Sequence, residues 1–346
     1  MNILSGVSDF FGLDVGTTSI RVVKLTGSGP IKTLERYASM PVDGNLAVSD
    51  AKADQRKLAQ VIAQLVKQSG ILTRDVAVGV PSSHVFTTVA DMEKLSRDEL
   101  AKTIRYQADS FIPTPLAESK IDWALLGDSP KDPSKAEVLL SSVSNEYVES
   151  RLDLLEEVGL NVIAFEPDAF ALMRAVVAPD ATTPQLVLDV GAKSTDLVVV
   201  VNGAPRLTRS IPVGTDAIIR SAIAGLAVDA TQATQFVYKF GLSKDKLEGR
   251  VYNSIIGVVD NLVAEVEKSI KFFQSRYATL KLERIIVTGG ASTLPEFPLY
   301  IANKFGMNVE IGNAWRNINF PASQQNELLS ISNHFAVACG LAERQT

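Results

Sequence analysis

Short apolar runs bounded by turn residues make up much of the N-terminal third of the chain. Three of these runs predict strands, at residues 10–13, 20–25 and 75–81. Residues 53–69 instead carry apolar side chains at helical spacing, and Gly70 follows them where a left-handed cap ends a helix. Strands and helices that alternate in this way predict an α/β domain.

A second, more compact pattern begins after residue 84. Ser96 and Glu99 have the spacing of a capping box, so a helix is expected from there to residue 110. Another helix is predicted at 145–158, and strands are predicted at 85–90, 121–126, 137–143 and 160–165. This β-α-β-β-α-β order predicts an inserted subdomain at 84–164.

The remainder of the chain combines strands with longer helices. Strands are predicted at 186–188, 196–201, 206–211 and 285–287. Helices are predicted at 169–177, 215–241, 254–276, 292–305 and 332–343. The pattern therefore predicts a second α/β unit after the insertion.

Two segments share one arrangement of residues. Each has an apolar strand, then Asp-Val-Gly, then small polar residues, then a second apolar strand, and the aspartates are Asp14 and Asp189. The copies lie 175 residues apart, which is about half of the chain. An internal repeat of this length predicts two related lobes that face each other.

The chemistry of these two turns favours a phosphate group. A glycine in a tight turn lets backbone N–H groups approach an anion closely. Asp14 and Asp189, one in each turn, would hold a hydrated Mg²⁺ between them, because this ion prefers oxygen ligands and keeps several waters. Hydroxyl donors accompany both turns, from Thr17, Thr18, Ser194 and Thr195.

A third glycine turn extends this pattern. Gly289 and Gly290 follow an apolar strand and precede a helix, which is a suitable place for an adenosine to rest. A single Asp-x-Gly turn is more often structural than phosphate-binding, and a strand-to-helix turn is common. The three elements together predict a nucleotide clamp.

Composition narrows the class of protein. The chain has 346 residues, and 34 Lys and Arg against 39 Asp and Glu give a net charge of −5, so there is no general basic surface for nucleic acid. The only cysteine, Cys339, excludes an internal disulfide and a multi-cysteine metal site. No apolar run is long enough to span a membrane, and the first residues lack a signal peptide's basic region and apolar core. We therefore expect a cytoplasmic protein that reaches a membrane only through partners.

These motifs resemble those of the actin-like ATPase superfamily, and within it those of the PilM family of type IV pilus assembly proteins. The resemblance covers nearly the whole chain. It rests on the phosphate motifs DVGTTSIRVVKL and DVGAKSTDLVVVVNG, and on the inserted segment SRDELAKTIRYQADSFIPTPLAE. The segments LVAEVEKSIKFFQS, IIVTGGASTLPEF and HFAVACGLAER then follow in the family's order.

The resemblance implies an actin-like (ribonuclease H-like) duplicated two-lobe fold with a ferredoxin-like, SHS2-type insertion. The first lobe would comprise residues 1–83, 165–184 and 331–346, and the insertion residues 84–164. The second lobe would comprise residues 185–215 and 283–330, and a helical subdomain residues 216–282.

The resemblance also implies bound ATP and Mg²⁺. The first phosphate turn would comprise Asp14, Gly16, Thr17 and Thr18, with Arg21 near the phosphates. The second would comprise Asp189, Gly191, Ala192 and Thr195, and the adenosine loop Gly289 and Gly290.

Two positions depart from the family pattern. Relatives carry a Glu and a Lys near the nucleoside, where this chain has Thr234 and Val237. Weaker nucleotide binding and at most weak ATPase activity are therefore expected. Glu166 and Asp168 lie in the segment that joins the lobes, where a structural or helix-capping role is expected.

The implied partner is the cytoplasmic N-terminus of a PilN-like inner-membrane protein, alongside other pilus platform proteins and further copies of this chain. Phe111, Ile112 and Pro113, with the groove between the insertion and the first lobe, are the candidate partner site. The same residues would also serve simply to end and pack a helix. Two alternative functions are compatible with the same fold: an FtsA-like division filament and a sugar-type kinase.

Overall fold

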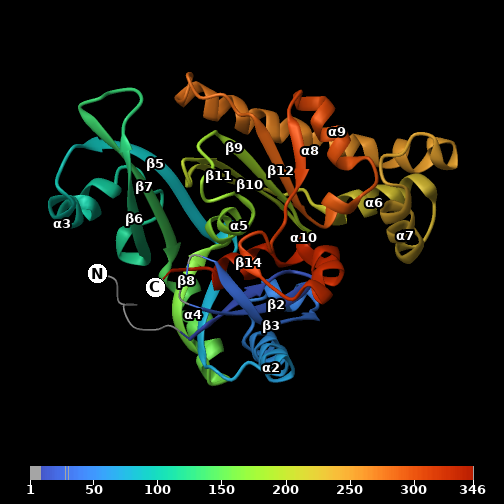
Figure 1. Cartoon of the computed structure of the whole chain (residues 1–346), viewed down its shortest axis with the longest axis horizontal. Helices are drawn as coiled ribbons and strands as arrows, with labels where there is room; N and C mark the ends of the chain where they lie inside the picture. Colours follow the sequence, from blue (N-terminus) through green and yellow to red (C-terminus); the bar gives the residue numbers. More distant parts are fainter. Residues whose placement is uncertain (1–8, 28, 30, 346) are drawn as a thin grey trace.

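The computed structural model describes residues 9–27, 29 and 31–345, and Figure 1 shows two sheet-based lobes with an insertion beside them. Residues 1–8, on which the expectation about a signal peptide rests, lie outside the described residues. Among the described helices, none has both the length and the apolar character needed to cross a membrane.

The first lobe is built on a six-stranded sheet in the order β14-β3-β2-β1-β4-β8. Three antiparallel strands form a meander, and β4 and β8 extend it in parallel from β1. The strands are β1 (Phe11–Val15), β2 (Ser19–Thr26), β3 (Lys32–Pro41), β4 (Asp75–Val80), β8 (Asn161–Pro167) and β14 (Ile318–Asn319).

The second lobe repeats this plan in a five-stranded sheet ordered β11-β10-β9-β12-β13. Again an antiparallel meander is extended by two parallel strands. The strands are β9 (Gln185–Val190), β10 (Thr195–Val201), β11 (Ala204–Ile211), β12 (Arg284–Gly289) and β13 (Asn308–Ile311). The repeated plan agrees with the sequence repeat.

The two sheets are layers of a single stack. Helices α1 (Gly44–Val48), α2 (Lys52–Ser69) and α4 (Asn145–Glu157) belong to the first lobe, and the apolar faces of α2 and α4 pack on one face of its sheet. Between the two sheets lie α5 (Asp168–Val176) and α10 (Gln325–Ala342), which share one apolar core with both. The outer face of the second sheet carries α6 (Thr215–Leu226), α7 (Ala230–Phe240), α8 (Arg250–Arg276) and α9 (Phe297–Phe305).

The central helices pack unusually closely. A Cβ on Gly340 of α10 would lie 1.8 Å from the carbonyl oxygen of Ala171 in α5, so only glycine permits this approach. A Cβ on Gly12 of β1 would lie 2.5 Å from the carbonyl oxygen of Ala338. Both contacts fix α10 against the sheet and against α5, at the point where the two lobes meet.

The insertion contains a three-stranded antiparallel sheet ordered β5-β7-β6. Its strands are β5 (Val85–Glu93), β6 (Ser119–Asp128) and β7 (Lys135–Ser144), and α3 (Arg97–Ala108) covers one face. The predicted capping box is present, because the Ser96 side chain and backbone N–H both interact with Glu99. Short 3-10 helices complete the fold, at Ser82–His84, Leu116–Glu118, Lys246–Gly249, Gly290–Thr293 and Ala322–Gln324.

Two segments belong to a different part of the fold from the one that the sequence suggested. Helix α4 and strand β8, expected in the insertion, belong to the first lobe, because β8 pairs with β4 and Leu154 and Leu155 enter that lobe's core. Strand β14, expected in the second lobe, pairs with β3. Nearby, Trp315 packs against Tyr37 and Phe335 in the core between the lobes.

A buried ionic network ties the insertion to the second lobe. Glu137 of β7 accepts hydrogen bonds from Arg276 Nη2 at 2.8 Å and from the Tyr277 hydroxyl at 2.8 Å. Arg276 Nη2 also donates to Asp91 of β5 at 2.7 Å, and Arg206 of β11 lies 3.5 Å from the other oxygen of Glu137. The insertion is therefore fixed to the second lobe by buried polar contacts.

Candidate functional site

The two Asp-Val-Gly turns have the same backbone geometry. Val15 pairs with Ile20 across the first turn, and Val190 pairs with Thr195 across the second, so each turn contains four residues. In each, the glycine N–H donates to the carbonyl three residues later, at 3.1 Å from Gly16 and 2.9 Å from Gly191. The predicted repeat is therefore a repeat of local structure.

The same register places different partners beside the two aspartates. Asp14 lies opposite Arg21 and accepts a hydrogen bond from its Nη1 at 2.9 Å, whereas Asp189 lies opposite Asp196. A carboxylate beside a carboxylate is unfavourable, while a carboxylate beside a guanidinium is stabilised. The first turn is thus internally neutralised, and the second carries excess negative charge.

The third glycine turn lies against the second turn. Gly289 has a φ of 76°, and a Cβ there would lie 2.3 Å from Asp189 Oδ1 and 2.5 Å from the carbonyl oxygen of Val190. The N-terminus of α6 approaches from the other side, because Thr215 N donates to the Gly191 carbonyl and Asp216 N to the Ala192 carbonyl, both at 2.9 Å. A helix N-terminus carries partial positive charge and suits a phosphate.

These elements surround one cleft of about 400 Å³ between the lobes. Its lining includes all but one of the residues predicted to contact nucleotide: Asp14, Gly16, Thr17, Thr18, Arg21, Asp189, Gly191, Ala192, Gly289 and Gly290. The remaining one, Thr195, is fully buried, and its hydroxyl donates to the Val213 carbonyl at 2.7 Å. Thr195 therefore supports the turn from behind.

Burial and mutual repulsion raise the pKa values of the acidic residues in the cleft. Burial, with the charges of Asp196 and Asp14, raises the pKa of Asp189 to about 7. Burial, then the charge of Asp14, raises the pKa of Asp168 well above its ordinary value. Burial also raises the pKa of Asp14, although Arg21 opposes this effect. Perturbed carboxyl groups gathered in a cleft are typical of a functional site.

The oxygen atoms in this cleft fit a hydrated cation. Oδ1 of Asp168 is buried and has no hydrogen-bond partner among the described residues, so it has unused capacity to accept from metal-bound water. No three His, Cys, Asp or Glu side chains within the described part of the chain converge closely enough to hold a bare ion. Magnesium retains several waters, so contact through water from Asp14 and Asp189 remains chemically suitable.

The nucleoside side of the cleft differs from the expected family pattern. Thr234 lines the cleft, but its hydroxyl donates to the Ala230 carbonyl at 2.8 Å. Val237 is fully buried in the core of the second lobe. Tyr238, one residue further along α7, lines the cleft, and a Cβ on Gly290 would lie 3.1 Å from its hydroxyl oxygen. An aromatic ring thus lies beside the predicted adenosine loop.

Sequence reasoning did not place Asp168, Asp196 or Tyr238 in the cleft, and these three bring polar side chains into it. Only Asp196 had a signal in the sequence, because the 175-residue offset of the repeat places it at the position of Arg21. Asp168 comes from the start of α5, and its neighbour Glu166 points elsewhere, paired with Arg174 and with Arg344 at 2.9 Å.

A separate groove of about 330 Å³ lies between the insertion and the first lobe. One wall is the face of the inserted sheet that α3 leaves uncovered, where Ala124 pairs with Leu139. The opposite wall combines the apolar side chains of Phe165 and Phe170 with the ion pair of Glu166 and Arg344. The groove reaches the free edge of the sheet, because five successive residues of the edge strand β6, 120–124, line it.

The predicted partner residues lie just before this edge strand. Phe111 is 40% exposed and Pro113 is also exposed, whereas Ile112 is 5% exposed and packs in the insertion core. Ile112 therefore supports the packing of α3, and Phe111 and Pro113 present the accessible surface.

Comparison with known proteins identifies a family and several similar structures. The sequence profile of a family described as "Type IV pilus assembly protein PilM" matches residues 12–346. The chain belongs to the PilM family. The chain is also similar to the structure of a "PilM-PilN type IV pilus biogenesis complex", with a TM-score of 0.80, 25% identity, and 96% and 97% of the two chains covered.

More distant likenesses establish the fold of this PilM-family chain. EutJ of Carboxydothermus hydrogenoformans matches with a TM-score of 0.57 and 16% identity, covering 96% of this chain and 88% of EutJ. MreB5 of Spiroplasma citri bound to ADP matches with a TM-score of 0.58 and 12% identity, covering 96% and 95%. The predicted actin-like fold is therefore confirmed, and the matches favour neither a division filament nor a sugar kinase.

Proposed function

We propose that this chain is an actin-like, nucleotide-binding scaffold of the inner-membrane platform that assembles type IV pili. The main support for nucleotide binding is the pair of Asp-Val-Gly turns, which have the same strand register and line one cleft from its two sides. ATP would lie between them, with its phosphates at Gly16 and Gly191 and its adenosine beside Gly290. The MreB5 of Spiroplasma citri is bound to ADP, which supports an adenine nucleotide in this fold.

In this proposal, Mg²⁺ would be held through water by Asp14 and Asp189. When bound with ATP, the ion supplies positive charge that offsets the phosphates and the carboxylates together. In this proposal the chain itself positions the turns and keeps the carboxylates out of bulk water.

Equilibrium binding of ATP with Mg²⁺ tests the nucleotide assignment. The Asp189→Ala variant should bind at least tenfold more weakly, a change of about 1.4 kcal/mol. The matched control is Asp180→Ala, which removes an exposed carboxylate from the segment after α5, outside the cleft. Equal affinity in all three proteins would refute the clamp.

The groove beside β6 is the proposed site for a PilN-like partner. The partner named in the related structure is PilN, and we infer that its cytoplasmic N-terminal segment adds to the free edge of β6. Main-chain hydrogen bonds at that edge would supply affinity, and Phe165 and Phe170 would receive apolar side chains. The chain would then be cytoplasmic and would reach the inner membrane through this partner.

A peptide with the N-terminal sequence of a PilN protein tests this site. Ala124→Arg projects a long side chain from the exposed groove wall and should weaken binding at least tenfold. Phe111→Ala tests the predicted partner residues, and Tyr106→Ala, at an 84% exposed position on α3, is the control. Loss of binding only with Phe111→Ala would move the site from the groove to the helix end.

A further inference from the structure

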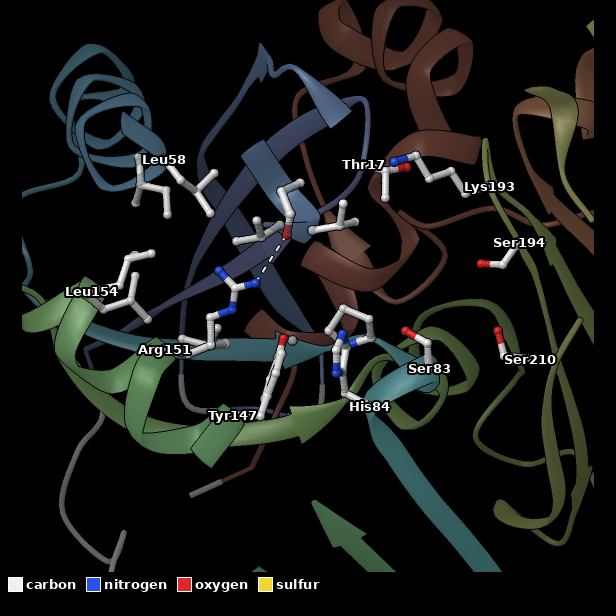
Figure 2. A pocket seen from close by; sticks show the side chains of 18 of the residues that line it. Thr17, Leu58, Ser83, His84, Tyr147, Arg151, Leu154, Lys193, Ser194 and Ser210 are labelled. Atoms are coloured by element: carbon white, nitrogen blue, oxygen red, sulfur yellow. Dashed lines mark hydrogen bonds between the residues drawn. The ribbon is translucent and has the colours of Figure 1, made fainter. Parts of the chain in front are cut away.

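A second cavity, of about 500 Å³, adjoins the nucleotide cleft and shares part of its lining, but its walls from α2 and α4 are its own. Figure 2 shows Leu58 from α2 and Leu154 from α4 on one side, with Lys193 and Ser194 from the second lobe on the other. Five residues line both the cavity and the cleft: Val15, Thr17, Pro81, Lys193 and Ser194. The volume of the cavity lies within the usual range for a small-molecule pocket.

The inner part of the cavity is apolar. Leu58 and Ile62 of α2 and Leu155 of α4 are almost completely buried, and each lines this open space. A ligand with an apolar body would cover the apolar surface that Val48, 52% exposed, and the other accessible lining residues present to water.

The guanidinium of Arg151 lies on the polar side of the cavity, beside two aromatic rings. The guanidinium of Arg151 donates from Nη2 to the Ala47 carbonyl at 3.2 Å, while its Nη1 is buried without a partner. Tyr147 lies beneath this guanidinium with its ring centroid 5.3 Å away, and His84 stacks on Tyr147 at 4.2 Å. Figure 2 shows these three side chains together along one wall.

The charge balance favours an anion. Lys193 lies on the opposite wall, where its ammonium donates to the Gly44 carbonyl at 3.2 Å. Within the part of the chain that the structure describes, no Asp or Glu lines this cavity. The negative charge of Asp50 acts on the pKa values of His84 and Tyr147, and that of Asp168 acts on the pKa of Tyr147. Neither aspartate lines the cavity. A buried guanidinium N–H without a partner gains most from an anionic acceptor.

We propose that this cavity binds a small organic anion with an aromatic or branched apolar body, whose anionic group pairs with Arg151. The apolar body would occupy the space beside Leu58 and Leu154. A bound molecule would contact α4 of the first lobe and Lys193 of the second, so it would favour one angle between the lobes. The proposal does not depend on nucleotide binding or on the partner groove.

The test uses anilinonaphthalene sulfonate as an anionic fluorescent probe and N-phenylnaphthylamine as its neutral counterpart, with the full chain. One sulfonate probe should bind per chain. Arg151→Leu should weaken the sulfonate about tenfold and leave the neutral probe unchanged, because only the charge-assisted contact is lost. Arg56→Leu on neighbouring α2, whose side chain is 71% exposed, is the matched control.

A second variant tests occupancy without depending on charge. Val48 lines the cavity and is 52% exposed, so Val48→Trp should obstruct the space without disturbing the core and should weaken both probes. Leu72→Trp, at an 89% exposed position, controls for the added indole. Ala124→Arg should leave the sulfonate bound, which excludes the groove beside β6 as its site.

Three results would overturn the proposal. The first is sulfonate binding that neither Arg151→Leu nor Val48→Trp changes. The second is complete displacement of the sulfonate by ATP together with unchanged sulfonate affinity in Arg151→Leu, which would place the probe in the nucleotide cleft. The third is displacement by the PilN N-terminal peptide, which would assign the cavity to the partner.

Discussion

The carboxylate of Glu137 should contribute substantially to stability, although it lies far from the nucleotide cleft. It is 3% exposed and accepts three hydrogen bonds at one oxygen: from Arg276 Nε at 3.1 Å, Arg276 Nη2 at 2.8 Å and the Tyr277 hydroxyl at 2.8 Å. Burial, with a contribution from Glu137, raises the pKa of Tyr277, so this hydroxyl keeps its proton and remains a donor. Glu137→Gln preserves the shape of the side chain and removes its charge.

The magnitude follows from what the substitution leaves behind. Breaking a buried ion pair by removing one charge typically costs about 3–5 kcal/mol, because the other charge stays buried. Arg276 retains Asp91 at 2.7 Å, and Arg206 retains the Leu126 carbonyl at 3.3 Å. We therefore expect the lower end of that range, about 3 kcal/mol. At roughly 2 °C per kcal/mol for a chain of this size, the unfolding temperature should fall by roughly 6 °C.

Urea unfolding measures this loss and also locates it. The chain has two tryptophans: Trp123 reports on the insertion, and Trp315 reports on the core between the lobes. In Glu137→Gln, the transition seen by Trp123 should come before that seen by Trp315, because the lost contacts tie the insertion to the second lobe. The control is Glu149→Gln, at an exposed position on α4.

Two results would refute this reasoning. One is a loss of stability below about 1 kcal/mol, which is the range of an exposed ion pair. The other is simultaneous transitions at both tryptophans with the full loss, which would show that the network stabilises the whole molecule equally and does not hold the insertion in particular.

Three further predictions concern the cleft. Burial and Asp196 raise the pKa of Asp189 from an ordinary 3.8 to about 7, so the folded state binds more protons than the unfolded state between these pH values. The free energy of unfolding should therefore fall as pH rises from about 3.8 to about 7. In Asp189→Asn, urea unfolding measured across this pH range should show a weaker decline. Gly289→Ala should lower both the unfolding temperature and the ATP affinity, because its Cβ would lie 2.3 Å from Asp189 Oδ1 at a φ of 76°. Gly290→Ala is the control and should unfold close to the temperature of the parent protein, because its Cβ would lie 3.1 Å from its nearest neighbour, the Tyr238 hydroxyl oxygen. Tyr238→Ala should weaken ATP about tenfold if its ring stacks on the base, and unchanged affinity in a titration would exclude that contact.

Local signals explain what the sequence predicted well. The turns at Gly16 and Gly191 could be predicted because a strand, an aspartate, a glycine and a returning strand are contiguous in the chain, and the hairpin register follows from them. The end of α2 at Gly70 followed from the same kind of information, since Gly70 adopts a φ of 73°. In both cases the residues that determine the structure are neighbours in sequence.

Long-range packing accounts for what was not predicted. Strand β3 (Lys32–Pro41) has few apolar residues, and it forms because β2 and β14 pair with its two edges. Helix α9 begins at Phe297, later than the predicted residue 292, because a 3-10 turn and a left-handed Glu296 come first. Asp168 and Tyr238 enter the cleft from α5 and α7, and no local pattern around either residue indicates this position.

The difference between the two turns also determines which aspartate is the more informative to change. Arg21 already neutralises Asp14 at 2.9 Å, so removing Asp14 would also leave a buried guanidinium without its partner. Asp189 faces Asp196 instead, and its removal relieves repulsion in the free protein. Asp189→Ala should therefore stabilise the empty protein while weakening ATP with Mg²⁺. Because loss of folding cannot produce those two opposite effects, their combination would identify Asp189 as the carboxylate that faces the bound cation.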